Sequence, residues 1–114
     1  MPEALPPLLR RVIAVEAHRR RTGACPRLLH ALGTGESFAI EPLADGFLDV
    51  ESSLRVRDAE GGLRWPEGEA ALVLEDDVAF SGTASGLRFS GRAGGGSSVT
   101  LYAGGDYWQY AVVT

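Results

Sequence analysis

The sequence predicts an α+β fold in which one N-terminal helix packs on antiparallel β-sheet. Two observations lead to this prediction. Apolar residues recur at helical spacing near the N-terminus, and the rest of the chain consists of short runs of alternating apolar and polar residues between glycine-rich turns. At 114 residues, with 45% hydrophobic and 23% charged residues, the chain is long enough for one globular domain over 1–114.

The helix is predicted from about Pro7 to Arg21. Pro6 and Pro7 suit a first helical turn, and Gly23 follows the last one. Cations at the C-terminal end interact favourably with the helix dipole. Four residues of the apolar stripe are expected to be buried, either against the sheet or against partner helices: Leu5, Leu9, Val12 and Ile13.

The last quarter of the chain predicts a three-stranded meander. Apolar and polar residues alternate over Leu87–Ser90, over Val99–Ala103 and over Trp108–Val112. Period two is typical of a half-buried antiparallel sheet. Glycine-rich turns at Arg92–Ser98 and Gly104–Asp106 allow the chain to reverse twice.

The middle of the chain predicts further short strands. Cys25–Leu32 is ambiguous between a short helix and a strand, but Gly33–Gly35 followed by Ser37–Ile40 favours a hairpin. Four more runs look like strands separated by turn signals: Phe47–Val50, Leu54–Arg57, Ala71–Leu74 and Val78–Phe80. One helix followed by many strands indicates a helix packed against a sheet.

Charge is distributed unevenly along the chain. All eleven basic residues are arginine and the net charge is −4, yet residues 1–30 carry +4 and residues 31–114 carry −8. The N-terminal segment is therefore basic and the body acidic. No run reaches the roughly 20 apolar residues of a membrane-spanning helix.

Three segments resemble a known family. Ala14–Gly23 is similar to the end of a pilin helix, Leu87–Leu101 to the family's glycine- and serine-rich hairpin, and Tyr107–Val113 to its final aromatic-to-valine strand. The chain thus resembles type IV pilin-like proteins, particularly minor pseudopilins and minor pilins of the GspH/FimT type.

This resemblance implies a pilin-like fold, with residues 1–23 as the C-terminal half of the pilin helix and 24–114 as the β-rich domain. A leader and an apolar half-helix would precede residue 1 and anchor the full-length protein in the bacterial inner membrane, facing the periplasm. The implied function is a non-catalytic subunit that assembles with other pilins or pseudopilins through its helix. Either a type IV pilus or a type II secretion pseudopilus is open, and no cofactor is implied.

The residues themselves give little support for an enzyme. His18, His30 and Cys25 stand in no nucleophile motif, and Glu75–Asp77 lacks the alternating carboxylates of a calcium loop. A solvated helix face for His18 and a solvated turn for the acidic triplet are the simpler interpretations. We expect neither a catalytic nor a metal site.

A binding module for DNA or carbohydrate is the alternative function. Five arginines are candidates for contact with DNA, as in DNA uptake: Arg19, Arg20, Arg21, Arg88 and Arg92. The acidic body argues against strong general affinity for nucleic acid. If Tyr102 and Tyr107 share an exposed face with Arg88 and Arg92, they form a stacking platform for single-stranded DNA or a sugar.

Overall fold

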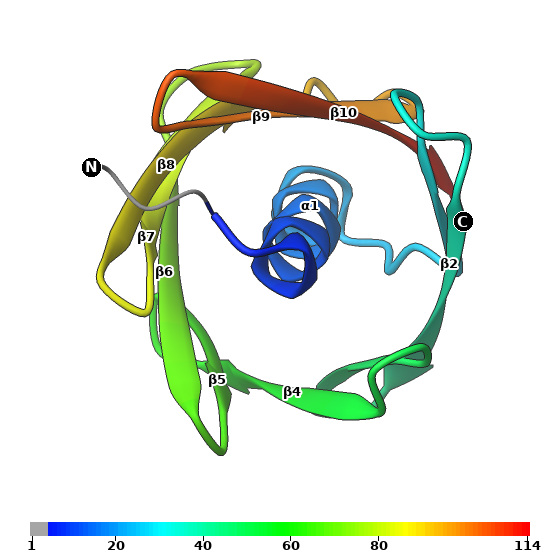
Figure 1. The fold of residues 1–114 in the computed structure, drawn as a ribbon. Helices are drawn as coiled ribbons and strands as arrows, with labels where there is room; N and C mark the ends of the chain where they lie inside the picture. The colour runs from blue at the N-terminus through cyan, green and yellow to red at the C-terminus, as the bar shows by residue number, and fades with distance from the viewer. Residues whose placement is uncertain (1–4) are drawn as a thin grey trace.

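The computed structural model describes residues 5–114, which form a closed antiparallel β-barrel around one helix (Figure 1). The helix α1 spans Pro7–Thr22. The strands are β1 (Leu28–Ala31), β2 (Ser37–Leu43), β3 (Gly46–Asp49), β4 (Leu54–Ala59), β5 (Gly62–Trp65), β6 (Gly68–Leu74), β7 (Ala79–Ala84), β8 (Leu87–Arg92), β9 (Ser98–Ala103) and β10 (Asp106–Val113).

The barrel is an up-and-down meander that closes on itself. Each strand pairs with the next one in sequence, and β1 also pairs with β10, from Leu28 opposite Val113 to Ala31 opposite Tyr110. Closure removes the free edges that an open sheet would expose. The segment 23–27 joins α1, which lies inside the barrel, to β1 in the barrel wall (Figure 1).

The helix is enclosed because it is buried on almost every side. Its buried residues are Leu9, Arg11, Val12, Ile13, Ala14, Val15, Glu16, Ala17 and His18. A sheet that covers one face of a helix would leave the other faces exposed, so it could not bury this helix on almost every side. Ten strands enclose a wider interior than the eight that side chains alone can fill, which leaves room for a helix.

The barrel wall contributes the other half of the core. Alternate residues point inward on each strand, and the largest of them with less than 2% exposure are Phe47, Phe80, Leu29, Leu63, Leu72, Leu101, Val56 and Val99. The helix backbone lies closest to β9, β6, β10 and β7. Long side chains span the remaining space toward β3 and β4, where Arg11 reaches Asp49 and Arg19 reaches Asp58.

The Arg11–Asp49 pair is the main polar contact between helix and wall. Arg11 Nε and Nη2 donate to the two carboxylate oxygens of Asp49, each at 2.9 Å, and the Asp49 residue is fully buried. The backbone N–H and hydroxyl of Ser52 also donate to Asp49, at 3.2 and 2.6 Å. Burial by itself would raise the pKa of Asp49, but these hydrogen bonds outweigh burial and lower it.

The two ends of the barrel differ in what they contain. Helix α1 begins at the end formed by the β1–β2 and β9–β10 hairpins, where Arg10 stacks over Trp108; we call this end the N-terminal mouth. The helix ends at the opposite, C-terminal mouth, where Arg21 donates to the carbonyl of Ala93 between β8 and β9. Gly23 terminates the helix with a left-handed φ of 77°.

The predicted pilin-like α+β fold is wrong, and with it the resemblance to the GspH/FimT type. That fold packs a long helix on one side of a sheet, whereas here the sheet closes around a helix of 16 residues. The hairpin and final-strand patterns that suggested the family are patterns that any antiparallel meander shares. The pilin, pseudopilus and secretion assignments therefore lose their structural basis.

The predictions of individual helices and strands were more accurate than the prediction of the overall fold. The helix was expected over Pro7–Arg21 and ends one residue later, and the C-terminal meander is confirmed as β8–β10. Cys25–Leu32 contains strand β1, as the hairpin interpretation required. Strand β5 was missed because Gly62 and Pro66 at its borders look like continuous turn signals. Within residues 5–114, no helix has the length and apolarity needed to cross a bilayer.

The expected helix-packing residues lie inside the barrel. Leu5, Leu9, Val12 and Ile13 are at most 9% exposed and belong to the core that the wall and helix share. In this state the wall covers them, so they offer no surface to a partner helix.

Candidate functional site

Two tyrosines form an exposed aromatic surface on the outside of the barrel. Tyr107 of β10 lies directly opposite Tyr102 of β9, and their ring centroids are 6.4 Å apart with the planes tilted by 40°. Tyr102 is 41% exposed and Tyr107 is 65% exposed. Both point outward because their strand neighbours Leu101 and Trp108 point inward. We call this pair the tyrosine platform.

Polar side chains surround the tyrosine platform. A shallow depression of about 450 Å³ is lined by both tyrosines together with Arg88, Ser90 and Asp106. Ser90 lies opposite Tyr102 in the β8–β9 register. Within the part of the chain that the structure describes, Arg88 takes part in no ion pair or side-chain hydrogen bond, so its guanidinium donors are available to a ligand.

The backbone holds the platform in a fixed geometry. Tyr102 and Tyr107 sit on paired strands joined by the two-residue turn Gly104–Gly105, whose φ angles of 60° and 87° favour glycine. Side chains on paired strands are positioned more precisely than side chains on loops. A ligand would therefore meet a surface that is already formed, which lowers the entropic cost of binding.

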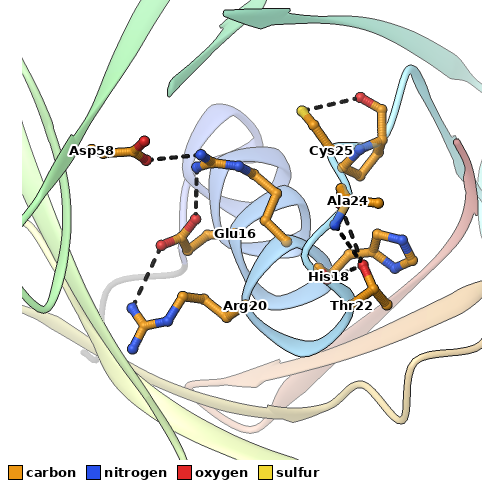
Figure 2. Close-up of polar contacts among 9 residues, drawn as sticks. Glu16, His18, Arg20, Thr22, Ala24, Cys25 and Asp58 are labelled. Atoms are coloured by element: carbon orange, nitrogen blue, oxygen red, sulfur yellow. Dashed lines mark hydrogen bonds and ion pairs between the residues drawn. The ribbon is translucent and has the colours of Figure 1, made fainter. Parts of the chain in front are cut away.

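The predicted DNA-contact arginines on the helix are engaged in internal contacts. Arg19 donates to Glu16 at 2.9 Å and to Asp58 at 2.8 Å, and Arg20 lies 3.6 Å from Glu16 (Figure 2). Arg21 donates to two backbone carbonyls, those of Ala93 and Ala79. These side chains help to hold the helix in the C-terminal mouth.

The two remaining DNA candidates lie on the outer face of β8. Arg92 is at the C-terminal mouth, where both it and Arg21 influence Asp76, while Arg88 is at the other end of the strand beside the tyrosine platform. The structure thus places Arg88 and Arg92 on the face that the sequence suggested. It does not gather all five arginines on one surface.

The other titratable candidates do not assemble into a reactive group. The Cys25 thiol donates to the Pro26 carbonyl at 3.4 Å, and burial raises its pKa, which disfavours the nucleophilic thiolate (Figure 2). His30 instead pairs with Ser37 on the barrel exterior at 2.9 Å. His18 was expected on a solvated face but is buried, and burial lowers its pKa.

Glu16 is likewise buried and serves as an anchor for Arg19 and Arg20. Burial raises its pKa even though both arginines favour the carboxylate. Its oxygens pair with two arginines of the same helix near the C-terminal mouth (Figure 2), so the residue has a structural explanation.

The acidic triplet Glu75–Asp77 forms a turn, as the simpler interpretation held. Asp76 accepts hydrogen bonds from the backbone N–H groups of Val78 and Ala79, at 2.8 and 2.6 Å, and these bonds lower its pKa. Among residues 5–114, no three His, Cys, Asp or Glu side chains are grouped to hold a metal ion.

Ser90 and Asp106 are site residues that the sequence analysis did not name. Ser90 alternates with Phe89 and so shares the outward face with Arg88, and Asp106 directly precedes Tyr107. The alternation alone would have identified Ser90. The position of Asp106 depends on how tightly the β9–β10 turn closes.

Comparisons with known proteins add no further assignment. No protein-family model, curated protein or solved structure matches this chain. The fold and surface chemistry define its class: a closed antiparallel barrel with an internal helix and an exposed aromatic surface.

Proposed function

We propose that the protein is a non-catalytic binding module that recognises carbohydrate through the tyrosine platform. The observation that carries this proposal is the exposed, cross-strand pair of Tyr102 and Tyr107 beside Arg88, which has no partner among the described residues. Two exposed aromatic rings side by side present a flat apolar surface on which a ligand can pack.

The chemistry of the platform matches that of a sugar. One face of a pyranose ring presents C–H groups that pack against an aromatic ring, while its hydroxyls need donors and acceptors at the edge. Arg88 supplies donors, Asp106 supplies acceptors, and the Ser90 hydroxyl supplies both. Two adjacent tyrosines favour an oligosaccharide over a single sugar unit.

Single-stranded DNA is the competing ligand, since bases also stack on aromatic side chains. Three observations favour sugar. The protein carries a net charge of −4, Asp106 stands at the platform itself, and Arg19 and Arg21 of the helix are engaged in hydrogen bonds within the protein. Affinity for nucleic acid depends on many phosphate contacts, and among residues 5–114 Arg88 is the single cation that lines the depression.

The experiment is calorimetric titration with soluble oligosaccharides of glucose, N-acetylglucosamine and xylose. We expect one of these series to bind, and Tyr102→Ala to weaken that binding by about tenfold, as loss of an aromatic contact worth about 1.4 kcal/mol requires. Val73→Ala is the matched control, because Val73 is 60% exposed on β6 and does not line the depression. That variant should bind like the wild type.

The same proteins are titrated with a single-stranded oligonucleotide at low and high salt. If DNA binds with strong salt dependence, and if Arg88→Ala with Arg92→Ala abolishes it, the DNA alternative replaces carbohydrate. Oligosaccharide binding that survives Tyr102→Ala unchanged would show that the sugar sits elsewhere and would overturn the proposal.

A further inference from the structure

A second cavity lies inside the N-terminal mouth, and it adjoins the tyrosine platform at Tyr107. It has a volume of about 480 Å³ and separates the first turns of α1 from β1, β2 and β10. Pockets of this size that are mainly apolar and hold a few polar groups are typical of small-molecule sites, and barrel mouths are a common place for them.

Aromatic side chains form the walls of this mouth pocket. Trp108 and Tyr110 point inward from β10, and Phe38 points inward from β2. The guanidinium of Arg11 lies 4.4 Å from the centre of the Phe38 ring and is fixed there by Asp49. Arg11 thus covers one face of Phe38, and Arg10 covers one face of Trp108 in the same way. Tyr110 and the part of Trp108 that Arg10 leaves uncovered remain to contact a ligand.

Arg10 brings a positive charge that no carboxylate of residues 5–114 pairs with. Its guanidinium lies 4.1 Å from the centre of the Trp108 ring, and its Nε donates to the Leu5 carbonyl at 2.7 Å. Within the described residues it forms no ion pair, in contrast to Arg11, which is paired with Asp49 and lies 3.7 Å from Glu51. A guanidinium has five N–H donors, so most of those on Arg10 remain available.

Tyr110 adds a second donor deeper in the pocket. The residue is 5% exposed and lines the pocket, and its hydroxyl has no hydrogen-bond partner among residues 5–114. Burial raises its pKa, which keeps the hydroxyl protonated and able to donate at neutral pH. The positive end of the α1 dipole lies at the same mouth, and the first turn holds no acidic residue.

We propose that the mouth pocket binds a small planar carboxylate, with the carboxylate on Arg10 and the Tyr110 hydroxyl and the ring within the apolar lining to which Trp108 and Tyr110 contribute. Charged hydrogen bonds from a guanidinium suit a carboxylate in geometry and strength. Among the described residues, Glu36, at the exposed rim on the β1–β2 loop, is the one carboxylate that lines the pocket. Tyr107 lines both the platform and this pocket, but Arg10, Trp108 and Tyr110 line the pocket alone, and the proposal goes beyond carbohydrate binding.

Benzoate is the probe, and benzamide is its neutral counterpart of similar shape. The protein has two tryptophans, so Trp65→Phe leaves Trp108 as the single tryptophan reporter of the pocket. We expect benzoate to change Trp108 fluorescence in a saturable manner and benzamide to bind about tenfold more weakly. Because Trp65 is a core residue, saturation-transfer NMR of benzoate with the wild type provides the same measurement without that substitution.

Two charge variants test the assigned contacts. Arg10→Gln should weaken benzoate binding by about tenfold, and Glu36→Gln should strengthen it, since the rim carboxylate repels the anion. Arg55→Gln, on the outer face of β4, is the control and should change nothing. Absence of saturable binding, equal affinity for benzamide, or full retention of binding in Arg10→Gln would overturn the proposal.

The test of the mouth pocket and the test of carbohydrate binding can be told apart. Tyr102→Ala should leave benzoate binding unchanged, because Tyr102 lines the platform and not the mouth pocket. Arg10→Gln should leave oligosaccharide binding unchanged for the converse reason. Either site can therefore fail without the other.

Discussion

Removing the Asp49 carboxylate should be the most damaging single polar change in this protein. Asp49 is fully buried and holds both the Arg11 guanidinium of the helix and the Ser52 hydroxyl of the β3–β4 turn. Asp49→Ala would leave Arg11 buried at 6% exposure, with only the more distant, exposed Glu51 nearby. Breaking a buried ion pair from one side costs about 3–5 kcal/mol.

That loss is a large share of the total, since domains of this size have unfolding free energies of about 5–15 kcal/mol. Measured by urea unfolding, with an m-value of about 2 kcal/mol/M, it should lower the midpoint by about 1.5–2.5 M. Asp45→Ala is the matched control. Asp45 pairs with Arg55 at 3.2 Å, but both side chains are about half exposed, and such surface pairs contribute at most about 1 kcal/mol.

A double variant separates loss of the pair from loss of packing. Arg11→Met combined with Asp49→Ala removes both charges and should recover much of the stability, because the cost lies in the unpaired charge. The pH dependence has a definite sign. Since the folded-state pKa of Asp49 lies below its ordinary 3.8, the stabilisation is complete above that pH and is lost as the pH falls through the folded-state value. An Asp49→Ala midpoint equal to that of Asp45→Ala would refute this account of the helix anchor.

Three further predictions can be checked by the same unfolding measurement. Gly91→Ala should destabilise the barrel by about 1–3 kcal/mol, because a Cβ there would overlap the Phe80 ring that packs on Gly91, whereas Gly96→Ala enters open space and should change stability little. The free energy of unfolding of Glu16→Gln should rise relative to that of the wild type as the pH rises above 4.5. The folded-state pKa of Glu16 is raised, so the wild type has a stabilisation that is lost between pH 4.5 and that pKa. The opposite trend would contradict the burial of Glu16. The free energy of unfolding of His18→Gln should rise relative to that of the wild type as the pH falls below 6.5, because burial disfavours protonation of the His18 imidazole in the folded state. Parallel pH profiles of unfolding free energy for the two proteins would argue against this.

The candidate sites were predictable to different degrees. Strict alternation along β9 and β10 was enough to place Tyr102 and Tyr107 on one face, and the register that makes them neighbours follows from the short Gly104–Gly105 turn. The mouth pocket was not predictable. It depends on Arg10 of the helix meeting Trp108 of the last strand, almost 100 positions later, and no local pattern encodes that encounter.

The helix arginines illustrate the same limit. A run of arginines at Arg19–Arg21 looks like an exposed basic surface when the helix is assumed to lie on a sheet. Once the wall surrounds the helix, the same side chains meet Glu16, Asp58 and backbone carbonyls. The contacts of these arginines therefore differ from the predicted ones, although the helix itself was predicted to within one residue.

The sequence by itself determined the local elements: a helix over Pro7–Arg21, which the structure extends by one residue, the C-terminal meander, and the inward and outward faces of its strands. These depend on periodicity and turn chemistry within a few residues. Only the tertiary structure decided that β1 pairs with β10 and that the sheet closes around the helix. An open sheet and a closed barrel share the same alternation, and the choice between them depends on burying a helix whose apolar surface extends beyond one face.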